Sequence, residues 1–397
     1  MRATVETSAA RLANRSAVLA RLLSGAAVAT RAALVEATGL SPATVSRVTD
    51  GLIGEGLIAE GPAVTSGQRG RNAVSLHVTG AMGSVCGVDI GGQNCRMVLS
   101  DLFGVQLACC QVPTPVELGA ADLADWLAGR VTALAAEAGP SLAAVALGLP
   151  GTVTQDGLQV SGAPNVPQIE GTVFARRVAR ALRVPVSLDN DANLALLGEL
   201  RFGAGRGLST VVMLTIGAGV GGGVALDGRL LRGRRGMVGE FGYLPAGPSG
   251  ELAEELLSGP GLIRRARAMG IVVAGAAEIF AARGPDRLDP LREQFDRALL
   301  LTLAAASAAY EPEAIIIGGG LSPVIATRLR DTGRRLQELL PAVPELRLAE
   351  LGDLSGALGA VTAACQSAYA QLGMTEADAA ALPAIQEVSD VHRASDQ

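Results

Sequence analysis

Three short motifs in this chain place carboxylates, carboxamides or glycines where a strand is expected to end. Residues 89–92 are Asp-Ile-Gly-Gly, residues 190–193 are Asn-Asp-Ala-Asn, and residues 217–223 include five glycines. A tight turn such as Asp-Ile-Gly-Gly can direct backbone amides at a phosphate. Carboxylates and carboxamides can hold adjacent hydroxyl groups. The motifs therefore indicate a site for a phosphorylated or polyhydroxylated ligand.

Two of these motifs, and an acidic segment farther along the chain, also have an interpretation that needs no ligand. Asn190 and Asp191 could cap the helix that follows them, and capping could coexist with ligand binding. The glycine run could form a hairpin that needs positive φ angles. Glu254, together with Glu251 and Glu255, could belong to a solvated helix face.

From about residue 84 the apolar pattern alternates between short strands and longer helices. The expected strands cover residues 85–92, 95–101, 143–149, 186–189, 210–216, 222–226 and 314–317. The expected helices cover residues 121–138, 170–182, 192–202, 291–310 and 361–372. Such alternation predicts an α/β protein with mostly buried sheets, and it places each motif at a strand end.

The first 80 residues have a different pattern. Thr30 can cap one helix, and Ser41 followed by Pro42 can begin the next after a short turn. This spacing is typical of a helix-turn-helix, whose second helix enters the major groove of DNA. The three expected helices cover residues 12–24, 31–38 and 42–55. A β-hairpin wing should follow, with strands at 57–60 and 73–76.

The outward face of the third helix and the loop of the wing carry the candidate DNA contacts. Small hydroxyl side chains allow close approach to base edges, and arginines can reach phosphates or guanine. Residues 1–80 have a net charge of +3 and the remainder −8, as suits a DNA-binding head on an acidic body. The alternative is a three-helix interaction module without a DNA target. The candidates are Ser41, Thr44, Ser46, Arg47, Arg69 and Arg71.

Six motifs follow one another in the order found in the ROK family (repressor, open reading frame, kinase), and the chain resembles that family over residues 12–370. The segment from Ser41 to Val48 also resembles MarR-like and ROK-type DNA-binding heads. Besides the three motifs above, the matching blocks are Gly-Leu-Pro-Gly at 148–151, Glu-Phe-Gly-Tyr at 240–243 and Ile-Gly-Gly-Gly at 317–320.

The resemblance implies an α/β chain with a winged helix-turn-helix at 1–80 and a two-lobed, actin/hexokinase-like (ribonuclease H-like) ROK body at 84–372. Lobe 1 would comprise about 84–190 and the last helix, and lobe 2 about 191–358. Ligands would meet in the cleft between the lobes. Residues 373–397 are polar and rich in Ala, which predicts a weakly ordered tail.

The resemblance also implies roles for individual residues. In kinases of the family the residue that matches Asp191 is the general base that takes a proton from the sugar hydroxyl. The positions that resemble sugar ligands are Asn165, Asn190, Asp191, Glu240, Tyr243 and Glu254. Those that resemble nucleotide-binding positions are Asp89, Gly91, Gly92, Gly217, Gly219, Gly319 and Gly320.

The chain departs from the family pattern at the phosphate loops and the zinc loop. Gln93 and Asn94 replace a Thr-Lys pair, and Ala218 replaces a Thr, so three phosphate contacts are lost. Tyr243 stands where the family has His, and residues 244–252 contain no Cys. Structural zinc needs four N or S ligands. We therefore expect no zinc, and ATP and magnesium are expected to bind poorly if at all.

Composition excludes several other classes. The chain of 397 residues, 49% of them hydrophobic, is long enough for two or three globular units. Its five cysteines form no CxxC pair, and two histidines leave little for imidazole catalysis. No apolar run approaches the roughly 20 residues of a membrane span, and no signal peptide is recognisable. We expect a cytoplasmic protein.

We interpret the chain as a sugar-responsive transcriptional regulator, in the first instance a repressor, with a degenerate kinase site. Its expected partners are a palindromic double-stranded operator and a sugar or sugar derivative, with the protein a homodimer or homotetramer and no membrane involved. One alternative is an active ATP-dependent sugar kinase that carries a DNA-binding head. A second is a regulator whose effector is not a sugar, or is a protein partner.

Overall fold

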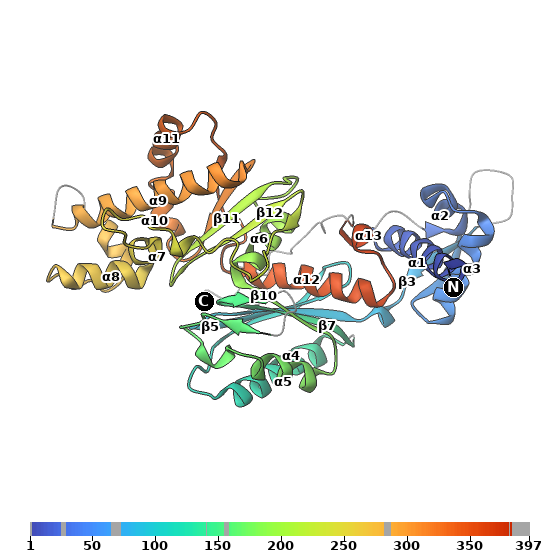
Figure 1. Cartoon of the computed structure of the whole chain (residues 1–397). Coiled ribbons are helices and arrows are strands. Elements are labelled where there is room, and N and C mark those ends of the chain that lie inside the picture. The colour runs from blue at the N-terminus through green and yellow to red at the C-terminus, as the bar shows by residue number, and fades with distance from the viewer. Residues whose placement is uncertain are drawn as a thin grey trace.

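The protein consists of an N-terminal head and two lobes, each lobe built on a five-stranded sheet (Figure 1). The computed structural model describes residues 2–24, 29–64, 73–139, 141–154, 159–281, 287–380 and 382. The head lies at one end of the molecule beside lobe 1, and lobe 2 lies at the other end. The α/β architecture with a helical N-terminal extension agrees with the fold expected from the sequence.

In the part of the head that the structure describes, three helices accompany a three-stranded sheet. Thr30 accepts a hydrogen bond from the Ala33 amide (3.1 Å), and Ser41 accepts one from the Thr44 amide (3.2 Å), so both predicted helix caps are confirmed. The strands are ordered β1-β3-β2. The elements are α1 (Arg2–Leu23), β1 (Ala29–Thr30), α2 (Arg31–Thr38), α3 (Pro42–Gly54), β2 (Ile58–Val64) and β3 (Ala73–Val78).

Arg31 fixes the helix-turn-helix against the hairpin. Its guanidinium pairs with Asp50 on α3 (2.8 Å) and with Glu60 on β2 (2.6 Å), and also donates to the Thr49 hydroxyl (3.1 Å). These contacts set the angle of α3 within the head. The wing arginines Arg69 and Arg71 lie outside the described residues.

Lobe 1 has helices on both faces of its sheet, whose strand order is β10-β7-β4-β5-β6. Figure 1 shows α4 and α5 covering one face and α12 the other. The strands are β4 (Ser84–Ile90), β5 (Asn94–Asp101), β6 (Gln106–Pro113), β7 (Leu142–Leu149) and β10 (Val186–Asn190), with the hairpin β8 (Thr152–Val153) and β9 (Val160–Ser161). The helices are α4 (Ala120–Ala138), α5 (Val173–Leu182) and α12 (Ser355–Gln371), with short turns η1 (Gly80–Met82) and η2 (Pro167–Ile169).

Lobe 2 repeats this plan with the order β13-β12-β11-β14-β15. Its strands are β11 (Val211–Ile216), β12 (Val220–Leu226), β13 (Arg229–Leu230), β14 (Ala314–Gly318) and β15 (Glu345–Leu348). Its helices are α7 (Ala253–Leu257), α8 (Gly259–Ala268), α9 (Asp289–Tyr310), α10 (Ser322–Ala326) and α11 (Leu329–Leu339), with turns η3 (Phe241–Tyr243) and η4 (Ala276–Phe280). A last turn, η5 (Gly352–Leu354), precedes α12.

Two helices join the lobes by crossing at glycines. α6 (Asp191–Phe202) follows the lobe 1 sheet and packs against α12 as well as against β11 and β12 of lobe 2. A Cβ added at Gly359 of α12 would lie 1.7 Å from the Leu194 carbonyl oxygen, and one added at Gly198 of α6 would lie 2.3 Å from the Ser355 carbonyl oxygen. The two backbones are therefore in direct contact.

A short helix beyond α12 contacts the head. The tail was expected to be weakly ordered from residue 373, but Glu376–Ala380 forms α13, which packs against α1 and α12. Arg15 of α1 donates to the Leu372 carbonyl oxygen (2.7 Å) and forms a two-point ion pair with Glu55 (2.7 Å). Residues 383–397 lie outside the described residues.

Ser16 makes the second connection between α1 and this segment. Its buried hydroxyl accepts a hydrogen bond from the Thr375 amide (2.7 Å) and donates to Asp378. Across the ranges described above, we find no helix with the length and apolar content needed to cross a bilayer.

Candidate ligand site between the lobes

Four carboxylates from both lobes are connected by electrostatic effects. Asp89 ends β4 of lobe 1 and Asp191 begins α6, whereas Glu240 precedes η3 and Glu254 lies on α7 of lobe 2. The charge of Asp191 acts on both Asp89 and Glu240, and the charge of Glu254 acts on Glu240. The structure thus brings together four residues that lie far apart in the sequence.

Burial raises the pKa of these groups. The pKa of Asp89 rises to about 7 because the carboxyl is buried, with the charge of Asp191 adding to the effect and Arg96 opposing it. Burial likewise raises the pKa of Glu240 to about 7, with Asp191 and Glu254 contributing. Burial raises the pKa of Asp191 to about 6, against a hydrogen bond from the Ala192 amide. Buried carboxyl groups with pKa values perturbed in this way are typical of functional sites.

Asp89→Asn should stabilise the protein, and the gain should grow as pH rises from about 4 to about 7 and then stay constant. Between the unfolded and folded pKa values the unfolded state releases this proton while the native state retains it, so the stability of the wild-type protein falls as pH rises through that window. The asparagine has no such cost, and the gain at pH 8 should be about 1 kcal/mol or more. Thermal unfolding of both proteins across this pH range measures the difference.

Asp125→Asn is the matched control for this experiment. The exposed Asp125 carboxyl has its pKa lowered by the hydrogen bond from Arg177, so its removal gives no gain that grows over the same window. A stability difference for Asp89→Asn that does not depend on pH would contradict the raised pKa of Asp89.

Asn190 and Asp191 form the first turn of α6. The Asn190 side-chain oxygen accepts hydrogen bonds from the Ala192 and Asn193 amides (2.9 and 3.1 Å), and its side-chain nitrogen donates to the Gly151 carbonyl oxygen (2.9 Å). Asn190 thus ties the helix start to the loop after β7. Capping, weighed above as an alternative, is observed, and it leaves Asp191 as the freer side chain of the pair.

An ion pair with an arginine of lobe 2 holds the motif at Asn190, and the sequence did not predict it. The buried Asp189 carboxylate accepts from Arg232 just beyond β13 (2.7 Å) and from the Asn193 side chain (3.0 Å). Arg232 lies in an Arg- and Gly-rich loop without periodic pattern. The only available signal was the acidic residue directly before Asn190, whose partner could not be identified without the fold.

The glycine run allows close packing and does not provide positive φ angles. Gly217 and Gly219–Gly223 all have negative or extended φ, so the positive-φ interpretation is wrong. A Cβ at Gly223 would lie 2.9 Å from the Ala192 carbonyl oxygen, and one at Gly222 would lie 2.5 Å from the Phe241 ring. The run therefore seats β12 against α6 and the segment of Glu240.

Two glycine loops that were expected to bind a nucleotide lie together in lobe 2. A Cβ at Gly217 would lie 3.0 Å from the Gly320 amide nitrogen, and Gly319 has φ +88° with its backbone against Ile216. On lobe 1 the turn after β4 closes through Gly91, whose amide donates to the Asn94 carbonyl oxygen (2.9 Å). Gly92 packs against Asn165, where an added Cβ would lie 3.0 Å from the Asn165 Cβ.

The remaining candidates for sugar binding differ in exposure. Asn165 is exposed, and Tyr243 is 62% exposed. Glu254 is half-buried and accepts a hydrogen bond from the Val220 amide (2.6 Å), so it braces the hairpin of the glycine run and is not part of a solvated helix face. Burial raises the pKa of Glu254, which this hydrogen bond opposes.

The loop at the position of the family's zinc loop is closed by hydrogen bonds. The Glu251 carbonyl oxygen accepts from the Ala246 and Gly247 amides, and its carboxylate accepts from the Ser249 amide (2.9 Å). Pro245 and Leu252 form a β-bridge across the base. In the described part of the chain, no group of three or more His, Cys, Asp or Glu residues is arranged to hold a metal.

The candidate DNA contacts that the structure describes lie on the start and outer face of α3. Ser41 and Arg47 are exposed, and Thr44 and Ser46 are half-exposed, while Val45, Thr49 and Leu52 are buried in the head. The Ser41 and Thr44 hydroxyls are 2.9 Å apart and serve the helix cap. Arg47 is therefore the long cationic side chain available on this face.

The model of the ROK family matches residues 85–367. The chain belongs to the ROK family. It is 31% identical to a glucokinase of Streptomyces coelicolor over 70% of this chain and 96% of that protein. It is 30% identical to a xylose repressor of Caldicellulosiruptor bescii over 58% of each protein.

Solved structures of ROK proteins agree with this fold. A ROK hexokinase of Thermus thermophilus, 33% identical, matches 71% of this chain and 97% of its own with a TM-score of 0.62. A ROK family transcriptional regulator, described as a homologue of the E. coli MLC protein, matches 93% of this chain and 99% of its own with a TM-score of 0.74. Its identity is 22%, so this likeness concerns the fold, but it spans the head as well as the ROK body.

Proposed function

We propose that this ROK protein is a transcriptional regulator that binds double-stranded DNA through its head and a sugar or sugar derivative between its lobes. The observation that carries the proposal is the head itself. It is a capped helix-turn-helix followed by the β2–β3 hairpin, and it contacts α13 of a body that brings four carboxylates from its two lobes together. The relatives of this chain include both a kinase, the glucokinase, and a regulator, the xylose repressor.

The proposed sugar site is centred on Asp191 and Glu240, with Asn165, Asn190 and Glu254 around it. Ionised carboxylates are strong acceptors for sugar hydroxyls, and hydroxyl donors would replace the solvent that burial removes from them. Ligand hydroxyls that donate to Asp191 also stabilise its ionised form. Sugar binding should therefore lower the raised pKa of this group.

The path proposed from the site to the head follows α12. Asp89 packs against the first turn of α12, since a Cβ at Gly356 would lie 2.9 Å from the Asp89 carboxyl carbon. The other end of α12 leads to Leu372 and α13, which hold Arg15 and Ser16 of the head. If the angle between the lobes changed where α6 crosses α12, Leu372 and α13 would move, and the head that they hold would move with them.

Such a switch needs a ligand that prefers one lobe arrangement. Moving a two-state equilibrium from 1:99 to 99:1 requires a difference in binding free energy of about 5.5 kcal/mol. Several charge-assisted hydrogen bonds of about 1.5–3 kcal/mol each could supply it. We propose that the regulator acts as a dimer or tetramer on a palindromic operator, so that both heads respond together.

An active sugar kinase is the second candidate, favoured by the 31% identity to a glucokinase over 96% of that protein. Asp191 stands at the start of α6 with a pKa of about 6, which suits a general base near neutral pH. Gln93, Asn94 and Ala218 count against it, because they supply neither the ammonium nor the hydroxyls that stabilise a transferred phosphoryl group.

The decisive experiment combines DNA selection with ligand release. Purified protein is used to select binding sites from random duplex DNA, and the complex is then titrated with monosaccharides and phosphosugars, with and without ATP and magnesium. We expect one sugar to change operator affinity without ATP. Asp191→Asn should retain DNA binding but require about 10- to 100-fold more sugar, because it loses a charged acceptor.

Arg47→Ala is the complementary variant. It should weaken operator binding by about 1–3 kcal/mol if Arg47 contacts a base, while thermal stabilisation by the sugar is unchanged. Failure to select any DNA sequence would reject the regulator. Sugar-dependent formation of ADP would instead favour the kinase, and DNA binding that no sugar affects would favour a different effector.

A further inference from the structure

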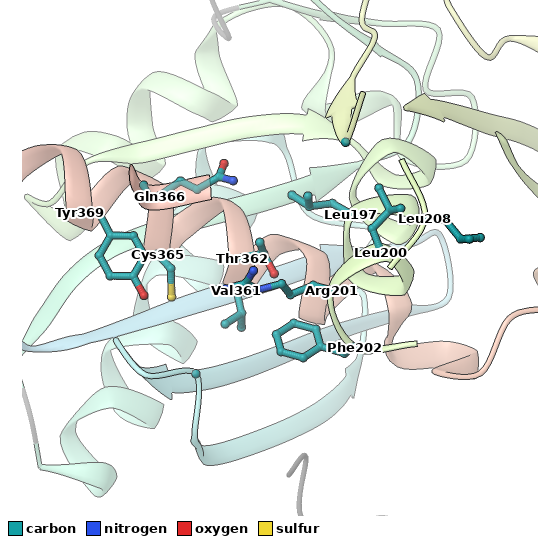
Figure 2. Close-up of a pocket in the computed structure, with 13 residues that line it drawn as sticks. Leu197, Leu200, Arg201, Phe202, Leu208, Val361, Thr362, Cys365, Gln366 and Tyr369 are labelled. Carbon is teal, nitrogen blue, oxygen red and sulfur yellow. The ribbon is translucent and has the colours of Figure 1, made fainter. Parts of the chain in front are cut away.

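The cavity between α6 and α12 contains a cation that is already engaged. Figure 2 shows this cavity, which has a volume of about 180 Å³ and is lined mainly by the later turns of α6 and the middle of α12. Its cationic lining residue is Arg201, which already has an interaction partner within the protein. The charge in this cavity therefore belongs to the packing of the two helices.

A larger cavity is an open groove on the outer side of lobe 1, with a volume of about 420 Å³. It lies along α5 and is bordered by α4, on the face of the lobe 1 sheet opposite α12 (Figure 1). None of the residues proposed above for sugar, nucleotide or DNA binding lines this groove. Its lining residues, all exposed, are Asp125, Val173, Arg176, Arg177, Arg180 and Ala181.

The apolar face of α5 determines which side chains reach the groove. Phe174 and Val178 are fully buried in the core of lobe 1, so the rotation of the helix is fixed. Residues 173, 176, 177, 180 and 181 then form one outward stripe at helical spacing. This stripe contains three arginines, and α5 contains no acidic residue. Any polar side chain would satisfy an exposed face, so packing does not account for the three positive charges.

The positive charges of the groove exceed the negative ones. The Arg177 guanidinium donates to both oxygens of Asp125, with the Nε–Oδ1 distance 2.8 Å, and the charge of Asp122 on α4 also acts on Arg177. Among the residues that the structure describes, the guanidinium groups of Arg176 and Arg180 form no ion pair or hydrogen bond. These two residues are four positions apart on one helix, where like charges repel. An anion in the groove would relieve that repulsion.

The spacing of the two arginines limits the class of anion. They are about one helical turn apart, roughly 5.4 Å along the axis, so two adjacent anionic groups on one ligand could each meet a guanidinium. Arginine holds phosphate through two parallel hydrogen bonds. The volume of about 420 Å³ falls within the range of about 300–1,000 Å³ for small-molecule sites. Val173 and Ala181, at the two ends of the stripe, offer apolar contacts to an organic part of the ligand.

We propose that the groove on α5 binds the diphosphate group of a small organic molecule, with Arg176 and Arg180 each holding one phosphate. The ligand would stabilise α5 by neutralising its two unpaired charges. α5 is followed in the chain by β10, the strand that ends at Asn190. The groove is therefore a second ligand input to lobe 1, separate from the sugar site and from the head.

Inorganic pyrophosphate is the probe, and orthophosphate is its analogue with a single phosphate. Calorimetric titration of the full chain, at low salt and without divalent cations, should show pyrophosphate binding at least ~10-fold more tightly than orthophosphate. The double variant Arg176→Gln/Arg180→Gln should weaken pyrophosphate binding at least ~10-fold and remove the preference over orthophosphate. Both side chains are exposed, so the variant should fold normally, and its thermal unfolding checks this.

Two further variants separate a built site from general attraction to a basic surface. Asp125→Asn releases Arg177 for the ligand, so pyrophosphate should bind at least ~3-fold more tightly. Arg183→Gln removes an exposed arginine just beyond α5 that does not line the groove, and it should change the affinity by less than ~2-fold.

Three results would overturn the proposal. They are no pyrophosphate binding up to about 10 mM, equal binding of orthophosphate, and a loss of affinity in Arg183→Gln as large as in the double variant. Pyrophosphate binding that the double variant leaves unchanged would place the anion elsewhere and would also reject the groove. These outcomes do not depend on DNA or sugar binding.

Discussion

Gly359→Ala should lose about 3 kcal/mol or more of folding stability. The new methyl group would lie 1.7 Å from the Leu194 carbonyl oxygen, and the obstacle is the backbone of α6, which cannot rotate away as a side chain could. The helices would have to separate, and the buried contacts around Leu194 and Ala357 would loosen. Urea unfolding followed by fluorescence of Trp126, the single tryptophan, measures the loss in lobe 1.

Gly129→Ala provides the matched control for Gly359→Ala. Gly129 also lies inside a helix, α4, but it is exposed and has no atom within 4 Å of an added Cβ. Alanine should stabilise this helix by about 0.5–1 kcal/mol, because it has less conformational entropy to lose. Equal effects at the two positions would show that helix propensity, and not contact between the backbones, decides the outcome at Gly359.

Glu199→Ala should destabilise the protein by about 3–5 kcal/mol. The Glu199 carboxylate is fully buried on α6 and accepts four hydrogen bonds. The donors are the amides of Ala204 (2.8 Å), Glu350 (3.1 Å) and Leu351 (3.0 Å) and the Ser355 hydroxyl (2.8 Å). These donors lie at the junction of α6, lobe 2 and the start of α12. Truncation of Glu199 would remove the acceptor that all four share. The same urea experiment measures the effect.

Glu313→Ala tests whether the loss of stability on truncation depends on burial or on the number of hydrogen bonds. Glu313 accepts from the Ser209 amide, the Ser209 hydroxyl and the Thr210 amide, each at 2.8 Å, but it is exposed. Water can satisfy those donors after truncation, so the cost should stay near 1 kcal/mol. Equal destabilisation of the two variants would show that burial of the Glu199 carboxylate does not add to its effect on stability.

Local signals allowed much of the fold to be predicted. α2 and the start of α3 agree with the expected bounds because the caps at Thr30 and Ser41 depend only on neighbouring residues. The buried strands β7, β11 and β14 were recognisable from continuous apolar runs. α1 begins at Arg2, ten residues before the expected start, because its first turns carry no apolar stripe. α12 begins at Ser355 and not at residue 361, because Gly356 and Gly359 are contact points and not helix ends.

Contacts between distant segments could not be predicted. The short elements β13, β15, α7 and α10 lack a pattern of their own and depend on tertiary packing. The alternating strand β6 and the amphipathic helices α8 and α11 were not among the expected elements, although they carry regular patterns. The motif at Asn190 was recognisable, but its fixation by Arg232 was not, because a salt bridge leaves no periodic signal. The four carboxylates were identified as candidates, whereas their mutual effect on pKa follows from the way the two lobes face each other.

The contacts of Arg15 and Ser16 also set an order of events during synthesis. Arg15 lies 357 residues before Leu372, and Ser16 lies 359 residues before Thr375. The head can form its own short-range helices while the ribosome is still translating the body. It cannot be anchored until both lobes have emerged and α12 has folded against them, because long-range contacts form last. During most of translation, a nascent chain therefore carries a folded head that is not yet under the control of its body.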